Sequence, residues 1–540
     1  MKEGRKKAIF LFLLLQIHTL CNSTSLSTKT RWIIDEKSRK RVKLTCVNWI
    51  SHMEPMIAEG LEKKPVSYIA SQIAANGFNC VRFTWPTFMF TRSNYSALTV
   101  SQSLDKFNLA AAKSGIGKNN PQFLNMTVVD VHEAVVDELR KRKTMVVLDN
   151  HVSMPSWCCS SGDGNGFFGD SHFDPNEWLQ GLSIVARKYK NNAAVIGMSL
   201  RNELRGRKQK MEDWYKYMKR GAEAVHKENP KVLVIVSGLS SDTKLDFLKN
   251  KPLGANVGNK LVYESHWYGF QTPAEKWVGQ TNRQCAVEIQ RARNNYLFLT
   301  TTGPGPFPVM MTEFGIDQRS TNEVDNRFVS CFLAVAAEYD LDWALWSFQG
   351  SYILRQGRVG IEEFYGVMNF NWDAPRNPSF LNRLKFVRQI NQVPKRSIPS
   401  YRLFHPQSGE CVGIGKKKRV RLGSCKTASR WEKHEEGGPI KLWGKGLCVG
   451  VVGEGAGAGV AEDCGCDDIG SRWKSVSASG LHLGAQHGRV GGGYLCLERN
   501  GSDAALVTRK CLCVGDDLRD FPQCADDPQL QWFKFVPVNA

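Results

Sequence analysis

The sequence predicts an α/β fold, a parallel (β/α)8 TIM barrel, followed by an all-β β-trefoil domain. Up to about residue 392, short apolar runs alternate with helix-like segments, which is typical of a β/α barrel. Beyond that residue, short apolar pairs lie among glycines and cysteines, and no long helical pattern remains. At 540 residues the chain is also too long for one ordinary core, so two domains are expected.

Short runs rich in β-branched and aromatic residues predict the barrel strands. There are eight of them: 42–49, 78–85, 144–150, 194–200, 232–237, 261–266, 309–312 and 341–346. Amphipathic stretches between most of these runs predict helices at 66–75, 128–142, 175–189, 211–227 and 322–338. Three long segments after strands (87–127, 152–174 and 347–377) are expected as loops that build a binding cleft.

The first 24 residues predict a secretory signal peptide, because a basic start (Lys2, Arg5) precedes the apolar run 8–15. We therefore expect a secreted, extracellular protein of the cell wall or apoplast, with no membrane span. Sixteen cysteines fit disulfides in an oxidising compartment, and losing Cys21 with the leader leaves an odd number. Glycosylation sequons begin at Asn94, Asn125 and Asn500.

The net charge of +20 favours anionic surroundings such as acidic polysaccharide. Nucleic acid is not an expected partner of a secreted chain, and the sequence contains no nucleic-acid motif. The basic run 416–419 reads as a solvated loop rather than as a dedicated polyanion site.

The predicted boundaries are a barrel at 25–392, a proline-containing linker at 393–400 and a β-trefoil at 401–540. The last segment holds nine cysteines and a weak internal repeat. Three units begin at Cys411, Cys448 and Cys496, and they close on tryptophans 431, 473 and 532. Three units of this size are typical of a β-trefoil.

Two glutamates carry the candidate chemistry. Glu203 follows the fourth predicted strand and Glu313 follows the seventh, a position where barrel enzymes keep catalytic groups. A pair of carboxylates is what glycoside hydrolysis requires. Polar or aromatic residues lie at the ends of other predicted strands: Arg82, His151, His266, Tyr268 and Trp346.

Taken in order, this set resembles glycoside hydrolase family 5, the cellulase-like retaining hydrolases, over roughly residues 30–392. The resemblance rests on Arg82, His151, Asn202, Glu203, His266, Tyr268, Glu313 and Trp346. Residues 400–540 resemble a ricin B-type lectin domain, and the whole chain resembles secreted plant proteins that join the two modules.

The resemblance implies a role for each residue. Glu203 would be the general acid/base and Glu313 the nucleophile, with the two carboxyls roughly 5–5.5 Å apart. Arg82 and Tyr268 would keep Glu313 ionised, and Asn202 would hold the sugar 2-hydroxyl. The remaining three would support the sugar and the carboxylates: His151, His266 and Trp346.

We therefore expect a retaining glycosidase acting on a β-linked polysaccharide or oligosaccharide (glucan, mannan or a related cell-wall glycan). No cofactor and no metal are implied. The alternatives are a transglycosylase on the same substrates and a non-catalytic carbohydrate-binding protein. The sequence leaves open whether the C-terminal domain binds a second carbohydrate ligand.

Further aromatic and loop residues are ambiguous from the sequence. Four tryptophans near strand ends fit either sugar stacking or core packing: Trp49, Trp85, Trp157 and Trp267. The segment 160–170 looks like a glycine-rich cleft loop rather than a calcium loop, because it lacks EF-hand spacing. The adjacent Cys158 and Cys159 either form a disulfide with each other or pair with separate partners.

Overall fold

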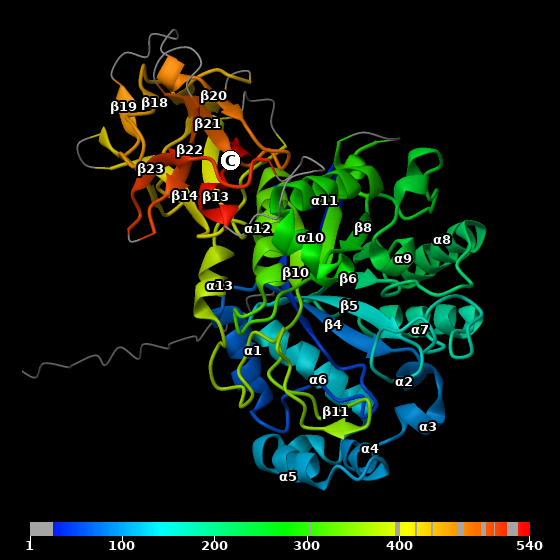
Figure 1. The fold of residues 1–540 in the computed structure, drawn as a ribbon. Coiled ribbons are helices and arrows are strands. Elements are labelled where there is room, and N and C mark those ends of the chain that lie inside the picture. Colours follow the sequence, from blue (N-terminus) through cyan, green and yellow to red (C-terminus); the bar gives the residue numbers. More distant parts are fainter. Residues whose placement is uncertain are drawn as a thin grey trace, which may run out of the picture.

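The computed structural model describes residues 25–301, 305–394, 400–415, 418–433, 436–461, 469–487, 493–501, 503–515 and 527–540. The predicted signal peptide (1–24) and most of the predicted linker lie outside these residues, as do Lys416 and Lys417 of the basic run. Figure 1 shows a barrel surrounded by helices, with a smaller region of strands beside helix α12 (Glu323–Glu338).

Eight parallel strands close into a barrel in the order β10-β3-β4-β5-β6-β7-β8-β9. They are β3 (Thr45–Trp49), β4 (Cys80–Pro86), β5 (Met145–Val152), β6 (Val195–Ser199), β7 (Leu233–Val236), β8 (Leu261–His266), β9 (Val309–Phe314) and β10 (Asp342–Leu345). All eight predicted strands are confirmed and differ only at their ends. Because the strands run parallel, their carboxyl ends meet at one rim of the barrel.

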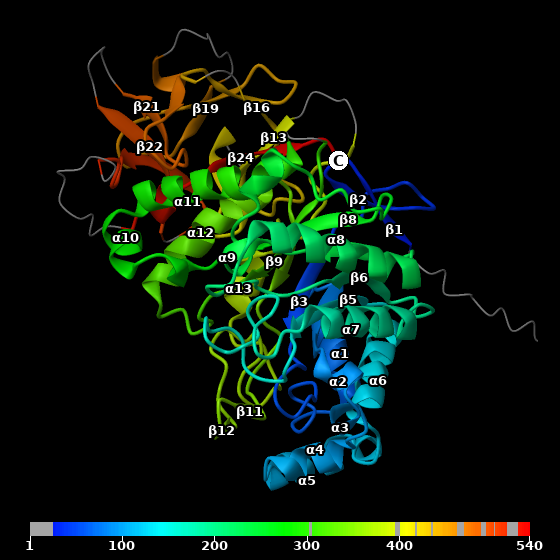
Figure 2. The same ribbon diagram turned by 90° about the vertical axis from the view of Figure 1, so that its right-hand side faces the viewer.

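A two-stranded hairpin packs against the opposite, amino-terminal end of the barrel. It consists of β1 (Leu26–Lys29) and β2 (Trp32–Asp35) (Figure 2). Leu26 and Ile33 share one buried cluster with the barrel's interior side chains. Lys260, just before β8, donates to the Leu26 carbonyl at 2.6 Å. The hairpin therefore covers the end of the barrel away from the rim.

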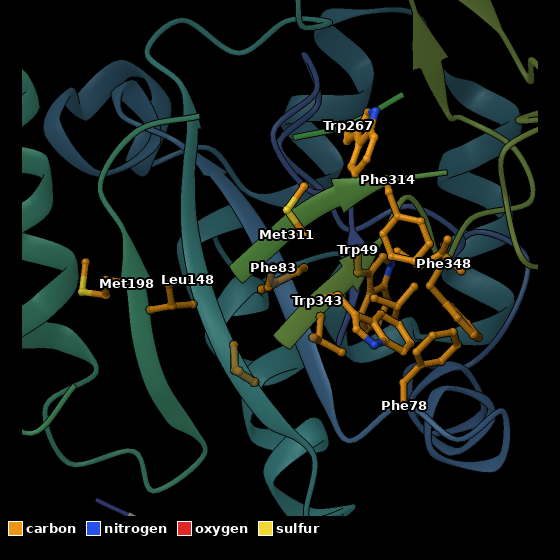
Figure 3. Close-up of a cluster of buried hydrophobic side chains, with 14 of the residues drawn as sticks. Trp49, Phe78, Phe83, Leu148, Met198, Trp267, Met311, Phe314, Trp343 and Phe348 are labelled. Atoms are coloured by element: carbon orange, nitrogen blue, oxygen red, sulfur yellow. The ribbon is translucent and has the colours of Figure 1, made fainter. Parts of the chain in front are cut away.

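Aromatic side chains fill much of the layer between strands and helices. Figure 3 shows Phe78, Trp343, Phe314 and Trp49 gathered in this layer. The ring of Trp343 packs edge-on against Phe314 at 5.6 Å and against Phe78 at 6.3 Å. These large apolar rings are fully or almost fully buried, so their removal from water stabilises the barrel.

All five predicted helices form, and most begin at a capping side chain. They are α1 (Val66–Ala75), α6 (Val128–Lys141), α7 (Pro175–Lys188), α8 (Met211–Glu228) and α12. Thr127, Asp174 and Asn322 each accept a backbone N–H in the first turn of α6, α7 and α12. Pro175 stands at the first helical position of α7, where its missing N–H costs nothing.

The prediction of a loop at 87–127 is wrong, because this segment holds four short helices. They are α2 (Phe88–Thr91), α3 (Ser93–Ser96), α4 (Val100–Lys106) and α5 (Ala110–Asn119). A capping box starts α4, in which Gln102 N–H donates to Thr99 Oγ1 at 3.2 Å and Thr99 N–H donates back at 3.0 Å. The first three are too short to show a clear 3.6-residue period, and α5 buries only Ala112 and Ile116.

Further elements lie where the sequence predicted no helix or strand, and one of these places is the segment 347–377, which was predicted as a loop. These are α9 (Leu239–Asp242), α10 (Ala274–Gly279), α11 (Thr281–Asn295), α13 (Pro378–Arg383), β11 (Leu354–Arg355) and β12 (Arg358–Val359). The last two form a small hairpin inside the long segment after β10.

The C-terminal region is all-β, with antiparallel pairing throughout its described strands. The strands are β13 (Ser400–His405), β14 (Glu410–Ile414), β15 (Val420–Gly423), β16 (Trp431–Lys433), β17 (Ile440–Leu442), β18 (Cys448–Gly450), β19 (Gly459–Ala461), β20 (Trp473–Ser475), β21 (Leu483–Gln486), β22 (Tyr494–Arg499), β23 (Leu506–Lys510) and β24 (Lys534–Val538). The last strand pairs with the first, β13, and the region has its own buried cluster around Trp431 and Trp473.

This region packs directly on helices α11 and α12 of the barrel (Figures 1 and 2). Trp532 is fully buried within the barrel's large hydrophobic cluster, and its indole N–H donates to Asn282 of α11 at 2.9 Å. Lys534 forms an ion pair with Glu338 of α12 at 2.7 Å. Two bodies that share buried apolar contacts in this way are expected to stay fixed relative to each other.

The barrel and the C-terminal region each contain disulfides of their own. The described pairs are Cys46–Cys80, Cys158–Cys159, Cys285–Cys331, Cys411–Cys425 and Cys496–Cys511. Cys448 and Cys513 are disulfide-bonded as well. Within the described ranges, no helix combines the length and the apolar character needed to cross a bilayer.

Candidate active site

The eight predicted site residues lie together at the carboxyl-terminal rim of the barrel. A cavity of about 340 Å³ opens there. Six of the eight residues line it: His151, Asn202, Glu203, Tyr268, Glu313 and Trp346. The other two, Arg82 and His266, are fully buried and contact the carboxylates directly.

Glu313 is the last residue but one of β9 and is 5% exposed. Its Oε1 accepts a hydrogen bond from Arg82 Nη1 at 2.9 Å, and its Oε2 accepts one from the Tyr268 hydroxyl at 3.0 Å. His266 Nδ1 lies 3.6 Å from Oε2. A buried carboxylate with a guanidinium and a hydroxyl donor is well placed to carry a negative charge.

Glu203 follows β6 in the left-handed backbone region, with φ of 40°. Its backbone N–H donates to Asp242 Oδ2 at 3.0 Å, and its carbonyl accepts from Arg205 Nη1 at 2.8 Å. These two contacts hold an unfavourable φ that the local sequence would not adopt unaided. The side-chain Oε1 lies 3.0 Å from His266 Nδ1. Glu203 therefore has neither of the two donors that hold Glu313.

The two carboxylates are close to each other. One oxygen of Glu203, one oxygen of Glu313 and a ring nitrogen of His266 all lie within 4.8 Å of one another. Retaining glycosidases have carboxyl groups about 5–5.5 Å apart, whereas inverting enzymes leave about 6.5–9.5 Å for a water molecule. The separation in this structure fits the shorter spacing of the retaining enzymes.

Burial sets the protonation of this pair. It raises the pKa of Glu203 to about 7, against the opposing charges of Arg205 and Arg82. It also raises the pKa of Glu313 to about 7, against His266 and Arg82. Two carboxyls this close do not ionise independently, because the first negative charge disfavours the second. The direct contacts of Arg82 and Tyr268 favour the charge on Glu313.

Arg82 connects the floor of the site. Its two terminal nitrogens donate to Asn48 and Glu313 on one side and to Asp149 and Asn202 on the other, at 2.9 to 3.0 Å. A planar guanidinium with fixed donors suits such a role better than an ammonium group. It lies in β4, so it reaches both halves of the barrel.

Three buried carboxyls of this floor were not predicted from the sequence: Asp149, Asp242 and Glu264. Asp149 accepts from Arg82 and lies 2.6 Å from His151 Nδ1. Glu264 accepts the Ser199 hydroxyl, and burial raises its pKa. Burial also raises the pKa of Asp242 well above its usual range. Asp149 and Glu264 lie inside predicted strands as buried acids, which is a usable sequence signal.

His151, Asn202 and Trp346 form one side of the cavity. The imidazole of His151 stacks on the Trp346 ring at 5.6 Å and lies 3.4 Å from the Asn202 amide nitrogen. Burial lowers the pKa of His151 well below its usual range, so the ring is neutral. The amide nitrogen of Asn202 also points to the sulfurs of Cys158 and Cys159, each at 3.6 Å.

Long segments after the strands supply the rest of the cavity wall. Its further lining residues are Trp157, Cys158, Cys159, Phe270, Arg355, Glu363 and Tyr365. Phe270 is 65% exposed and stacks on Tyr268 at 4.7 Å, so it presents an apolar face to solvent at the rim. Phe270, Arg355, Glu363 and Tyr365 had no sequence signal beyond their place in such segments.

The structure distinguishes cavity-lining from core positions among the four tryptophans near strand ends. Trp157 lines the cavity, whereas Trp49, Trp85 and Trp267 are buried core residues. In the segment 160–170, Asp163 pairs with Arg205, and Asp170 accepts the backbone N–H groups of Gly166 and Phe167. The charges of this loop are therefore used to fix its own fold and to hold Arg205.

Among the described residues, two groups of side chains bring potential metal-ligand atoms together. They are His151 with Cys158 and Cys159, and Glu203 with His266 and Glu313. In the first group the sulfurs are bonded to each other, so neither is a free thiolate. In the second group Arg82 and Tyr268 already occupy the oxygens of Glu313. The chemistry of these groups suits proton transfer and attack on carbon without requiring a metal.

Comparison with known proteins agrees with this geometry. A family model described as cellulase (glycosyl hydrolase family 5) matches residues 48–351. A "glycosyl hydrolase 5 family protein" of Chamaecyparis obtusa is 43% identical over 539 residues, covering 98% of this chain and 95% of that protein. An endoglucanase of Paenibacillus polymyxa is 23% identical over 305 residues, covering 51% and 71%.

Solved structures share the barrel fold. The endocellulase of Pyrococcus horikoshii has a TM-score of 0.54 at 18% identity, covering 68% of this chain and 100% of that chain. The catalytic domain of the major endoglucanase from Xanthomonas campestris has a TM-score of 0.52 at 20% identity, covering 67% and 98%. A complex of the P. horikoshii protein with cellotetraose has a TM-score of 0.53.

The family match identifies the protein as a glycosidase, an enzyme that hydrolyses O-glycosyl bonds. The β/α barrel with two close carboxylates at its rim agrees with this class. The chain belongs to glycosyl hydrolase family 5.

Proposed function

We propose that the protein is a secreted, endo-acting β-glucan hydrolase that retains anomeric configuration through two successive displacements. The observation that carries this proposal is the short separation of the two carboxylates, whose oxygens lie within 4.8 Å. That spacing leaves no room for a water molecule between carboxylate and sugar, so the carboxylate itself attacks.

Glu313 is the proposed nucleophile. Its carboxylate attacks the anomeric carbon, the bond to the leaving oxygen breaks, and a glycosyl ester of Glu313 forms. The hydrogen bonds from Arg82 and Tyr268 support this role, because they stabilise the ionised form before attack.

Glu203 is the proposed general acid/base. It donates its proton to the leaving oxygen in the first step. In the second step it takes a proton from water, whose oxygen attacks the anomeric carbon and breaks the ester bond to Glu313. Its lack of a direct guanidinium partner supports this assignment, because the resting carboxyl must hold its proton. His266 holds the Glu203 carboxyl, while Asn202, His151 and Trp346 are proposed to contact the sugar.

A β-linked glucan is the proposed substrate. The names of the bacterial relatives, endoglucanase and endocellulase, support this choice, as does the cellotetraose complex of one of them. The aromatic lining residues (Trp157, Phe270, Trp346 and Tyr365) supply faces that suit the C–H surfaces of sugar rings.

The remaining proposals concern organisation. We propose a barrel domain at 25–392, a linker at 393–400 and a β-trefoil of the ricin B type at 401–540. Binding of a second carbohydrate by the C-terminal domain would test the ricin B assignment. The two tryptophans Trp431 and Trp473 support the repeat, because each is buried and donates to the carbonyl of Val412 or Val449. The apolar leader sequence and the disulfides support secretion.

The decisive test uses Glu313→Gln together with a fluorinated mechanism-based glycoside. Wild type should acquire one covalent sugar on the peptide that contains Glu313, as measured by mass spectrometry. Glu313→Gln should fold normally, lose β-glucan hydrolysis and take up no label. The matched control is Glu212→Gln on the exposed start of α8, which should behave as wild type.

Two outcomes would contradict the proposal. A Glu313→Gln variant with normal activity would remove Glu313 as nucleophile, and an unlabelled, inactive wild type would indicate a carbohydrate-binding protein. Product analysis at high sugar-acceptor concentration separates hydrolysis from transglycosylation.

A further inference from the structure

We propose that the disulfide between the adjacent residues Cys158 and Cys159 is part of the sugar-binding surface, where it contacts the ring bound beside the reacting bond. The inference deepens the proposed function and rests on it. It assigns a role in substrate affinity to a pair of residues that the catalytic steps do not use.

The disulfide lies in the wall of the candidate active-site cavity. Both cysteines line the cavity, and both sulfurs lie 3.6 Å from the amide nitrogen of Asn202, the residue before Glu203. Cys158 and Cys159 follow β5, which stands four strands from β9 in the closed eight-stranded barrel. The disulfide thus follows the strand opposite that of Glu313, and both line the cavity in which a sugar attacked by Glu313 would lie.

The sulfur atoms of the disulfide suit contact with the apolar face of a sugar ring. Sulfur is polarisable and a weak hydrogen-bond acceptor, so it attracts C–H groups by dispersion and does not compete for hydroxyl groups. Much of the neighbouring surface is polar, with His151, Asn202 and Glu203 close by. The disulfide supplies an apolar patch there, which matches the C–H face of a β-linked sugar ring.

The disulfide is not needed to fix its own loop. On one flank, Asn165 Oδ1 accepts the N–H groups of Ser153 and Met154 at 2.9 and 3.0 Å. On the other flank, Arg205 Nε donates to the Ser160 carbonyl at 3.0 Å. These polar contacts hold the chain on both sides of the cysteines.

A disulfide between neighbouring residues also restrains the unfolded chain very little. The stabilising effect of a crosslink grows with the number of residues that it encloses. Cys158–Cys159 has a sequence separation of 1, whereas Cys46–Cys80 and Cys285–Cys331 have separations of 34 and 46. Global stability therefore gives little reason for this disulfide, and its position in the cavity wall gives a better one.

The wall continues beyond the reaction centre. Trp157 and Cys159 also line a second cavity of about 300 Å³, which includes Glu54 and Asp163. Cys159 and Trp157 therefore border both cavities. A glucan chain that extends from one cavity to the other would keep its next sugar in contact with these two residues.

The test compares Cys158→Ala/Cys159→Ala with wild type on a soluble β-glucan. Loss of the sulfur contacts should raise KM by about fivefold while kcat changes by less than about twofold, because the contact is equal in ground and transition states. The matched control is Cys411→Ala/Cys425→Ala, which removes a disulfide of the C-terminal region and should leave KM unchanged.

A binding measurement keeps the test independent of turnover. In the Glu313→Gln background, the affinity for cellotetraose should fall about fivefold in Cys158→Ala/Cys159→Ala and in Cys158→Ser/Cys159→Ser, as measured by calorimetry. The serine variant retains small polar side chains, and the melting temperature of each variant confirms that it is folded.

Each alternative outcome is decisive. Unchanged KM and unchanged cellotetraose affinity would overturn the inference while leaving the proposed function intact. A fall in kcat without a change in KM would also overturn it, since the disulfide would then act by positioning Asn202. A wild type that neither cleaves β-glucan nor binds cellotetraose would overturn the proposed function and this inference together.

Discussion

Glu203 and Glu313 are both almost buried, and their hydrogen-bond partners distinguish them. Glu313 receives hydrogen bonds from Arg82 and Tyr268, whereas the Glu203 carboxyl contacts His266. Since the guanidinium favours the nearer anion, we expect the proton shared by the pair to reside mainly on Glu203. The difference in partners thus supports different roles for two chemically identical side chains.

The pH dependence of the reaction should reflect this arrangement. Because burial raises the pKa of Glu203 to about 7, the carboxyl keeps its proton below that pH and loses it above. We therefore expect kcat/KM on β-glucan to fall as the pH rises above about 7. In Glu203→Gln, assayed with an activated aryl glycoside, this alkaline limb should disappear; a limb that persists would belong to another group.

Tyr268→Phe tests the hydroxyl that contacts Glu313. Removing a donor disfavours the ionised carboxylate, so the pKa of Glu313 should rise and the acidic limb of kcat/KM should move to higher pH. We expect kcat to fall about a hundredfold to a thousandfold, as when one hydrogen-bond donor is lost at a reacting centre. Neighbouring Phe270→Ala removes an exposed ring instead, and should raise KM without moving the pH profile.

The sequence was sufficient to predict residues that follow a recognisable order along the strands. Glu203 and Glu313 stand after apolar runs, and the structure brings them within reach of one sugar. Asp242 could not be predicted in this way, because it has a left-handed backbone conformation after β7 and its carboxylate accepts the backbone N–H of Glu203, 39 residues away in the chain. A contact of this kind leaves no periodic pattern in the chain.

Among the elements, the long amphipathic helices and the buried strands were predictable, and the short helices were not. The helix α1 forms at its predicted bounds, because four apolar side chains recur on one face. The helix α2 has only four residues and is stabilised by packing against α7. Its formation depends on tertiary contacts, which a local pattern does not contain.

The helix α7 offers a direct test of capping. Asp174 Oδ1 accepts the Asn176 N–H at 2.9 Å at the start of this helix. Asp174→Ala should lower the free energy of unfolding by about 1 kcal/mol, whereas Asp174→Asn, which also caps, should lower it much less. Urea unfolding of both variants measures the difference, and equal losses would contradict the capping role.

At the scale of the whole molecule, the barrel and the C-terminal region form one continuous packed structure. The change in sequence texture predicted two parts, and the first two repeat tryptophans do pack inside the C-terminal region. Trp532 departs from that pattern, because it joins the barrel's cluster and donates to Asn282. The repeat alone gave no reason to expect a contact with the other part.

Trp532→Ala should therefore affect both parts. Truncating a buried tryptophan costs about 3–5 kcal/mol, and here the lost contacts lie between the two bodies. We expect calorimetry to show one unfolding transition in wild type and two separated transitions in the variant. The matched change Trp443→Ala, at a side chain that is 43% exposed, should keep a single transition.

The docking of the C-terminal strands on α11 and α12 has a consequence for how the enzyme would meet a polymer. Modules on flexible tethers search a volume around their catalytic partner, and their gain in avidity depends on tether length. Here the anchoring contacts of Trp532 and Lys534 remove that freedom. Any glycan held by the C-terminal strands would lie at one fixed distance and angle from the barrel cavity. The stiffness of the glycan itself would then decide whether one molecule can reach both the strands and the cavity.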